Sequence, residues 1–191
     1  MLALLIAAGL AAAPEVGPPP AAFPAGPRWA PVAAHTAALF GGMRLSEALI
    51  WPDAFPLVPR DGFARFGRSW TQPPEWRAGP IFRSDGDPWA LNVFGHGLFG
   101  SEVFLKMRQC GHGPLAGGLA TAAASAFWEY GVEAFHKRPS GIDLLWTPIG
   151  GALLGELRFR LYRAAGGAGA GARIVRAIAD PFGEMERGAL G

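Results

Sequence analysis

The sequence predicts an all-α protein: a compact bundle of three principal helices with short flanking helices and a wrapping loop rich in tryptophan and proline. Apolar residues show no period-two alternation of any length, which argues against a sheet. Helix-start signals and Gly or Pro interruptions instead divide the second half of the chain into three helical segments. The 191 residues suffice for one modest domain with tails.

The N-terminus is typical of an exported protein. Residues 1–13 form an apolar run that ends in three alanines, as in a secretory signal peptide with its cleavage site. No Lys or Arg precedes the run and Pro14 follows it directly, so an uncleaved apolar tail is the alternative. Residues 14–31 are rich in Pro and Ala with almost no charge, which predicts an extended linker. The helical domain is then expected over 32–164.

Two less regular regions flank the principal helices. A short helix is predicted over 35–51, and residues 52–88 are expected to form a loop, because Pro and Gly recur there too often for long elements. The aromatic residues of this loop either cover a helical core or lie at the level of lipid headgroups. At the other end, residues 165–191 are predicted to hold a Gly-rich tract and a short amphipathic helix.

The three principal helices are delimited by local signals. An Asp-Pro pair begins the first, which is expected to extend over about 87–109. A Gly-rich turn separates it from the second, 114–137, and a Pro-Ser pair separates that from the third, 141–164. Ser140 and Asp143 have the spacing of a capping box, which predicts that they cap the third helix.

The composition restricts the classes of partner. Hydrophobic residues make up 50% of the chain and charged residues only 17%, against roughly 25% in typical soluble domains. This balance favours tight packing or contact with a lipid or membrane surface. The net charge of +2 and the scattered basic residues argue against a nucleic-acid partner. Cys110 is the only cysteine, so no internal disulfide can form.

Polar residues on helical faces that should be buried indicate the candidate site. On the second principal helix, Ser125, Glu129 and Glu133 share one narrow face, because successive residues turn by about 100°. On the first, Asn92 and His96 lie on one face beside glycines that would admit another backbone or a ligand. Buried polar groups need partners. His96, Glu129 and Glu133 are therefore expected to converge and are the candidate catalytic residues.

The wider polar cluster is expected to include Arg108 and Asp143 as well as Asn92 and Ser125. The alternatives are a hydrogen-bonded core histidine at His96 and a solvated helix end for the two glutamates. Glu133-x-x-His136 matches one unit of the carboxylate-bridged metal bundles, but that fold needs two such units. No metal ligands and no cofactor are therefore assigned.

A set of polar, glycine and proline residues between 85 and 156 resembles a known bacterial family. Its members are Asp85-Gly86-Asp87-Pro88-Trp89, Asn92, His96, Gly100-Ser101, Arg108, Gly111, Ser125, Trp128-Glu129-Tyr130, Glu133, Pro139-Ser140, Asp143-Leu144, Thr147-Pro148, Gly150-Gly151 and Gly155-Glu156. Together they resemble the uncharacterised bacterial envelope family DUF3943, a domain of unknown function. The resemblance implies an exported helical domain located in the periplasm or at an envelope membrane. It implies no activity.

Two functions from different classes follow from these observations. The first is a structural or lipid-contacting envelope module, in which a buried His/Glu/Asp network fixes helix register. The second is an envelope hydrolase or transferase, in which His96 acts as general base and Glu129 or Glu133 orients it or binds a metal. The first is favoured, because the sequence contains no recognisable nucleophile motif or oxyanion device. The sequence assigns no protein partner.

Overall fold

The all-α prediction is confirmed by a computed structural model, which describes residues 26–167 and 169–190. The described residues hold no strand, and Glu75 and Ser140 form one isolated parallel bridge. The chain divides into two compact units, which are described separately. One spans Pro24–Glu156, and the other contains the residues from Leu157 onward. The predicted signal peptide and most of the predicted linker lie outside the described residues.

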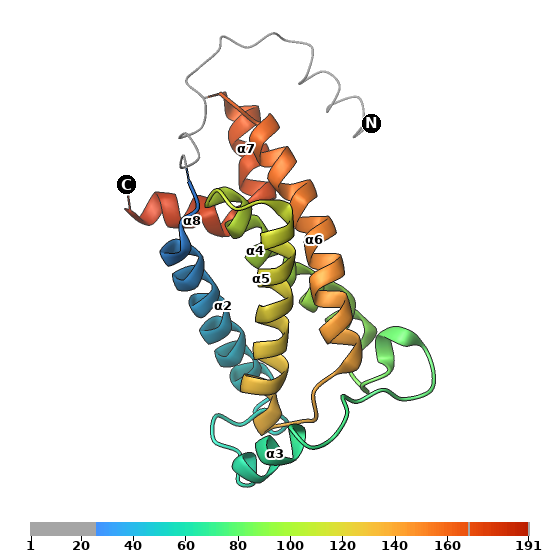
Figure 1. The fold of residues 1–191 in the computed structure, drawn as a ribbon. Helices are drawn as coiled ribbons and strands as arrows, with labels where there is room; N and C mark the ends of the chain where they lie inside the picture. The colour runs from blue at the N-terminus through green and yellow to red at the C-terminus, as the bar shows by residue number, and fades with distance from the viewer. Residues whose placement is uncertain (1–25, 168, 191) are drawn as a thin grey trace. The chain divides into compact units, whose positions relative to one another are not determined.

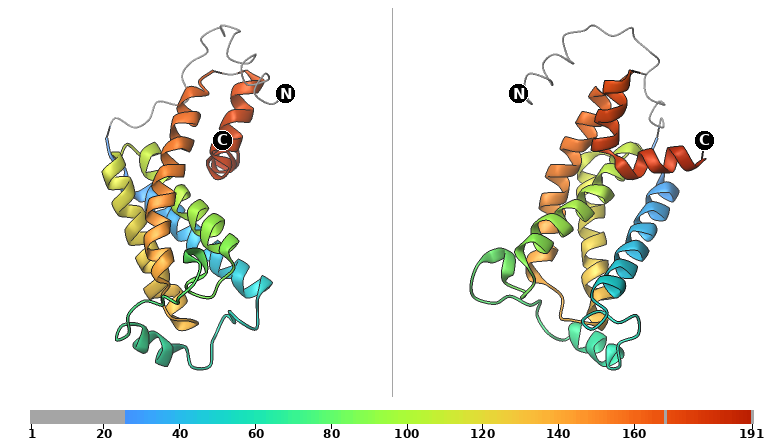
Figure 2. Two further views of the ribbon diagram at one scale, coloured as in Figure 1. Left: turned by 90° about the vertical axis from the view of Figure 1, so that its right-hand side faces the viewer. Right: turned by 180° about the vertical axis from the view of Figure 1, so that it is seen from behind.

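Four long helices build the unit Pro24–Glu156. They are α2 (Trp29–Ile50), α4 (His96–Gln109), α5 (Pro114–Phe127) and the first part of α6 (Gly141–Ala164). Helix α4 packs against both α2 and α5. Figure 1 shows the short helix α3 (Gly62–Ser69) near one end of α5, and the two further views show it at the same end (Figure 2). The three predicted principal helices are thus present, and α6 has the bounds that the sequence predicts.

Short irregular helical turns interrupt the predicted segments. A π-helical turn, η2 (Leu91–Gly95), precedes α4, and a second, η3 (Trp128–Val132), follows α5. The 3₁₀ turns η1 (Ile81–Arg83) and η4 (Glu133–Phe135) complete the set. Sequence periodicity missed both π turns, because it assumes a constant α-helical rotation per residue.

Glycines allow the helices to approach closely. A Cβ atom on Gly151 of α6 would lie 2.6 Å from the Cα of Gly100 on α4, so the two backbones touch at this crossing. Phe104 of α4 fills the space beside Gly155 of α6 and Gly117 of α5. The Gly151-x-x-x-Gly155 pair therefore serves the close helix contact that such spacing favours. Beside this crossing, Phe99, Val103 and Ala124 form an apolar cluster with side chains of α2.

The unit from Leu157 onward contains the end of α6, α7 (Ala170–Ala179) and α8 (Pro181–Leu190). Arg158 donates a hydrogen bond to the carbonyl of Ala179 at 2.9 Å. Arg176 donates to the carbonyls of Ala165 and Gly167 at 2.8 and 2.9 Å. These arginine bonds join α6 to α7 and to the turn between them. The sequence predicts α7 and misses α8.

Candidate functional site

The candidate site is a buried polar cluster where η2, η3 and the start of α6 meet. We use the name polar cluster for Asp85, Asn92, His96, Glu129, Ser140, Asp143 and Thr147. Asp87, Glu133 and Lys137 form an ion-pair group beside this cluster. Two π-helical turns flank it: η2 ends next to His96, and η3 contains Glu129. Such turns widen a helix locally and are frequent at functional sites.

His96 is the first residue of α4, and both of its ring nitrogens lie near polar atoms of α6. Its Nδ1 lies 3.1 Å from the hydroxyl of Thr147, and its Nε2 lies 3.4 Å from Oδ2 of Asp143. Burial and then the charge of Lys137 lower the pKa of His96 to about 3, against the pull of Asp85. The imidazole is therefore neutral at physiological pH, and its unprotonated ring nitrogen can accept a hydrogen bond or bind a metal.

Glu129 is fully buried, at 0% exposure, and only one of its two carboxylate oxygens accepts a hydrogen bond. Its Oε2 accepts a 2.7 Å hydrogen bond from the backbone N–H of Ser140, whereas Oε1 has no hydrogen-bond partner. Burial and the neighbouring charge of Glu133 raise the pKa of Glu129 well above its usual range, although Lys137 opposes them. The solvated alternative for this residue is therefore wrong.

Asp143 occupies the first turn of α6, but its carboxylate does not complete a capping box. Its backbone N–H donates to the Ser140 hydroxyl at 3.2 Å, as an N-cap requires, and its carbonyl accepts from Ser125 at 3.0 Å. Neither carboxylate oxygen makes a hydrogen bond of good geometry, although the side chains of Ser140 and Asp85 lie close enough to act on its pKa. Burial and then the charge of Asp85 raise the pKa of Asp143 to about 8. Glu129 takes the Ser140 N–H that a capping-box side chain would accept.

Asp85 joins the loop before η2 to the start of α6. Its Oδ1 accepts from the Asn92 side chain at 2.8 Å and from the backbone of Asp87 at 3.0 Å, while Oδ2 accepts from the Ser140 hydroxyl at 2.7 Å. Burial acts to raise the pKa of Asp85, but these hydrogen bonds outweigh it, and the pKa is lowered. Asp85 is therefore a satisfied, charged member of the cluster.

Lys137 holds the remaining acidic side chains together. Its Nζ lies 2.5 Å from Oδ2 of Asp87 and 3.3 Å from Oε2 of Glu133. The two acidic partners, Glu133 first, raise the pKa of Lys137 well above its usual value despite burial. Burial in turn raises the pKa of Glu133. Glu133 thus belongs to an adjoining ion-pair group, while His96 and Glu129 lie together with Asp143.

Arg108, which the sequence places in the polar cluster, lies elsewhere, and so does His136 of the Glu-x-x-His match. Arg108 pairs with Glu156 at 2.9 Å and donates to the carbonyl of His112, so its assignment to the polar cluster is corrected. His136 lies 2.9 Å from a guanidinium nitrogen of Arg44 and contacts the carbonyl of Pro56, so Glu133-x-x-His136 does not form a metal unit.

Three residues at or beside the polar cluster are not assigned to a site by the sequence. The Asp-Pro pair containing Asp87 indicates a helix start, and Asp85 and Thr147 appear only among the residues of the family resemblance. In the structure Asp85, Asp87 and Thr147 bond to Ser140, Lys137 and His96, respectively. These residues could have been found from the sequence, because Asp85, Asp87 and Thr147 each stand next to a glycine or proline in segments that carry the family resemblance.

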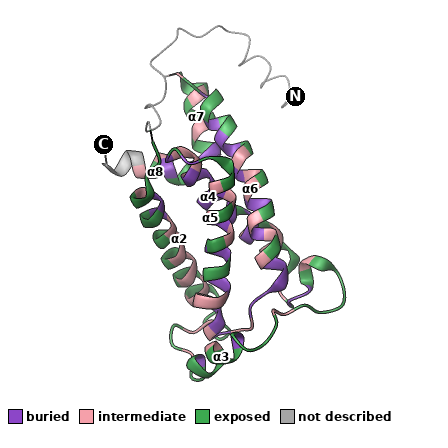
Figure 3. Cartoon of the chain, in the orientation of Figure 1, coloured by how far each residue is buried: buried purple, intermediate pink, exposed green. Residues whose placement is uncertain are grey.

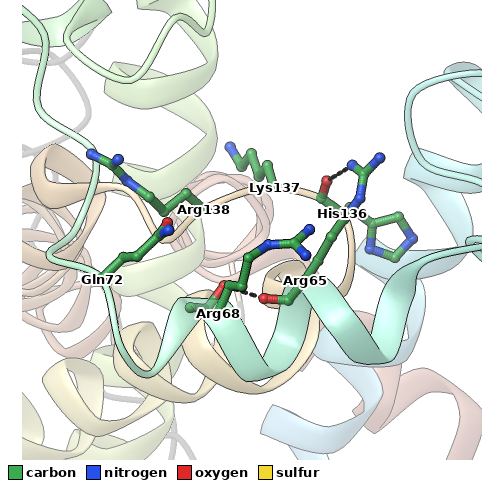
Figure 4. Close-up of a pocket in the computed structure, with 7 residues that line it drawn as sticks. Arg65, Arg68, Gln72, His136, Lys137 and Arg138 are labelled. Carbon is green, nitrogen blue, oxygen red and sulfur yellow. Dashed lines mark hydrogen bonds between the residues drawn. The ribbon is translucent and has the colours of Figure 1, made fainter.

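A separate pocket with a basic lining lies beside α3. Its volume is about 210 Å³. Arg65, Arg68 and Arg138 line this basic pocket with Lys137 (Figure 4), and no acidic residue does so in the described part of the chain. Arg65 donates to the carbonyl of His136, and Arg138 donates to the carbonyl of Pro74 at 3.3 Å. The pocket therefore concentrates positive charge and suits an anionic group.

These observations define the protein as a helical domain with a buried His, Glu and Asp cluster at a helix junction. The chain matches the family described as domain of unknown function DUF3943 over residues 81–182, more than half of its length, and belongs to that family. The match confirms the resemblance inferred from the motifs and extends it beyond residue 156, through α7. No curated protein and no solved structure matches the chain.

Proposed function

We propose that this chain is an exported envelope module that lies against an anionic lipid surface, and that its polar cluster fixes the register of the helices. The proposal rests mainly on one observation in the unit Pro24–Glu156: large apolar side chains cover the outside while polar side chains fill much of the inside. Export is inferred from the apolar run at residues 1–13. The periplasm or an envelope membrane is the proposed location.

The apolar exterior extends over several helices. We use this name for Leu45, Leu49 and Ile50 of α2, Leu115, Leu119 and Phe127 of α5, and Leu145, Ile149 and Leu153 of α6. Leu119 is 64% exposed and Leu153 69%. Figure 3 shows exposed residues along α2 and α5. Exposed apolar area of this extent on a soluble monomer marks contact with a membrane or another protein.

The interior of the same unit is unusually polar. Asn92, Glu129, Ser140, Asp143 and Thr147 are all buried completely. Buried polar groups cost free energy unless they are paired, and paired networks specify a unique arrangement of the elements that carry them. A polar inside with an apolar outside is the distribution expected of a protein in contact with lipid rather than water.

Lipid explains this exterior better than one protein partner does. The exposed side chains are leucines, isoleucines and phenylalanines on three helices, and a basic pocket flanked by exposed aromatic side chains lies on the same unit. No helix in the described residues is long and apolar enough to cross a membrane. The proposed contact is with the surface of a membrane.

The basic pocket gives this surface its charge preference. Arg65 and Arg68 stand beside exposed aromatic side chains, among them Phe63 at 86% exposure and Trp70. Aromatic rings with a polar edge gather at the headgroup level of membranes, and arginine pairs with phosphate. Charge complementarity therefore selects anionic phospholipid headgroups as the ligand of the pocket.

Vesicle flotation tests this function. The purified full chain should float with vesicles of phosphatidylglycerol and phosphatidylethanolamine, and less with phosphatidylcholine alone. Leu119→Gln with Leu153→Gln should reduce the floated fraction at least about threefold, whereas Ser46→Gln with Thr71→Gln, at exposed polar positions, should leave it unchanged. Arg65→Gln with Arg68→Gln should remove the preference for anionic lipid. A wild-type chain that stays in the aqueous fraction with both vesicle types contradicts the proposal.

The second candidate function is catalysis at His96. One observation favours it: Nε2 of His96 lies 3.4 Å from Oδ2 of Asp143, as in an imidazole that is oriented by an acidic side chain. Glu129→Gln separates the two functions, because the amide keeps the shape and the acceptor for the Ser140 N–H. A variant that folds with the wild-type melting temperature but reproduces the envelope phenotype of a deletion favours catalysis over a structural role.

A further inference from the structure

We propose that His96, Glu129 and Asp143 bind one divalent transition-metal ion of the Zn²⁺ type inside the bundle. This goes beyond the lipid-surface function and does not depend on it. Ligand atoms from the three side chains lie within 4.8 Å of one another, and all three residues are buried. Zn²⁺ binds such atoms at about 2.0–2.2 Å, so a small inward rotation of the carboxylates closes the site.

Unpartnered oxygens are the independent observation that points to a ligand. Both carboxylate oxygens of Asp143 and Oε1 of Glu129 are buried and make no hydrogen bond of good geometry. Buried acceptors are nearly always satisfied, so each exception calls for an unseen proton donor or cation. A proton on Asp143 satisfies one contact at a time, for example toward Asp85, whereas one cation satisfies oxygens of Asp143 and Glu129 together with the imidazole.

The neighbouring groups hold the ligands in the orientation that a metal needs. The Thr147 hydroxyl lies 3.1 Å from Nδ1 of His96, so Nδ1–H can donate to it and leave the lone pair of Nε2 on the Asp143 side. The Ser140 N–H binds Oε2 of Glu129 and leaves Oε1 for the ion. Metal-bound His and carboxylate side chains carry outer partners of this kind.

A second acidic group nearby shows why the ion belongs with His96. Ligand atoms of Asp85, Asp87 and Asp143 also lie within 4.8 Å of one another. However, both oxygens of Asp85 accept hydrogen bonds, and Asp87 pairs with Lys137. This group is already neutralised and satisfied. Imidazole, moreover, favours transition metals over Mg²⁺ and Ca²⁺.

The ligands come from α4, η3 and α6, so a bound ion would join three elements that are far apart in the sequence. Metal binding and folding are then coupled, because the unfolded chain has no preformed site. Loading with Zn²⁺ should therefore raise the melting temperature of the chelator-stripped full chain, and Mg²⁺ at the same concentration should not.

Elemental analysis and Zn²⁺ titration of the stripped full chain test the proposal. We expect about one Zn²⁺ per chain and at least about a 100-fold loss of affinity in His96→Gln and Asp143→Asn. The matched controls His136→Gln and Asp87→Asn lie outside the ligand set and should keep the wild-type affinity within about threefold. Equal affinity in wild type and His96→Gln, or the absence of Zn²⁺ binding by the wild type, overturns the proposal.

X-ray absorption spectroscopy on the Zn²⁺-loaded wild type covers the case in which a variant does not fold. The proposed ligands predict a coordination shell with one imidazole, no sulfur and otherwise oxygen. A shell that contains a thiolate, which Cys110 alone could supply, or two or more imidazoles places the ion elsewhere and overturns the proposal.

Discussion

Two regions of the unit Pro24–Glu156 are held together by different forces. Where α2, α4 and α5 meet, Phe99, Val103 and Ala124 pack on one another, and apolar side chains of α2 cover them. Where η2, η3 and the start of α6 meet, the contacts are hydrogen bonds and ion pairs of the polar cluster. Apolar packing is non-directional, whereas hydrogen bonds depend on distance and angle.

This contrast indicates which part of the fold is adaptable. An apolar core tolerates a change of shape when volume is conserved. A buried polar network does not, because each lost partner leaves another group unsatisfied. The polar cluster should therefore decide how α4 and α6 are aligned, and the apolar region should contribute stability with less dependence on particular residues.

The largest expected effect is that of Glu129→Ala. The substitution leaves the Ser140 N–H buried without an acceptor and creates a cavity. We expect the free energy of unfolding to fall by about 3–5 kcal/mol, measured by urea denaturation. Glu129→Gln is the matched control and should cost less than about 1.5 kcal/mol. An alanine variant as stable as the wild type would show that the cluster does not hold the helices.

The helix crossing between the two regions should be the next most sensitive. In Gly151→Ala the new Cβ meets the backbone of Gly100 at 2.6 Å, so α4 and α6 must move apart. We expect a loss of about 1–3 kcal/mol in the free energy of unfolding. Gly118→Ala, where a Cβ has open space, is the control and should not destabilise the chain. Equal losses of stability in the two variants would show that the close contact of α4 and α6 at Gly151 is not what makes this position sensitive.

A volume-conserving change in the apolar region should have a smaller effect. Met107 is completely buried with Val32 and Cys110. Met107→Leu should lower the free energy of unfolding by less than about 1.5 kcal/mol, whereas Met107→Ala should lower it by about 2–5 kcal/mol. If Met107→Leu instead costs as much as Glu129→Ala in the same urea experiment, the contrast between adaptable and exacting regions fails.

The last expected effect is a pH dependence from Glu47. Burial and then the charge of Glu133 raise the pKa of Glu47 from its usual value of 4.5 to about 7 in the folded chain, and Arg44 opposes them. The folded state therefore binds more protons than the unfolded state between these values, so stability falls as pH rises through this window. Glu47→Gln should match the wild type near pH 4 and melt higher near pH 8. If the melting temperatures of Glu47→Gln and the wild type differ by the same amount at every pH in this range, the prediction is contradicted.

The sequence predicts the helices better than it predicts the site. Cap signals and interruptions located all three principal helices, and Ser140 caps α6 as expected. The π turns could not be predicted from a constant helical period, and they give Glu129 and Glu133 different partners. Arg108 pairs with Glu156, which lies far away in the sequence, and local spacing does not predict such a pair. Asp85 reaches the site through a loop, where periodicity carries no information.

The most direct test of the lipid-surface account is the environment of the apolar exterior. In a Cys110→Ala background, an environment-sensitive fluorophore is attached at Leu119→Cys, Leu153→Cys or, as a polar control, Thr71→Cys. With phosphatidylglycerol vesicles, the account predicts blue-shifted emission at the two leucine positions and quenching by a quencher attached to the acyl chains, with neither change at Thr71. Emission at Leu119 and Leu153 that remains as in water, while the chain floats with the vesicles, would contradict it.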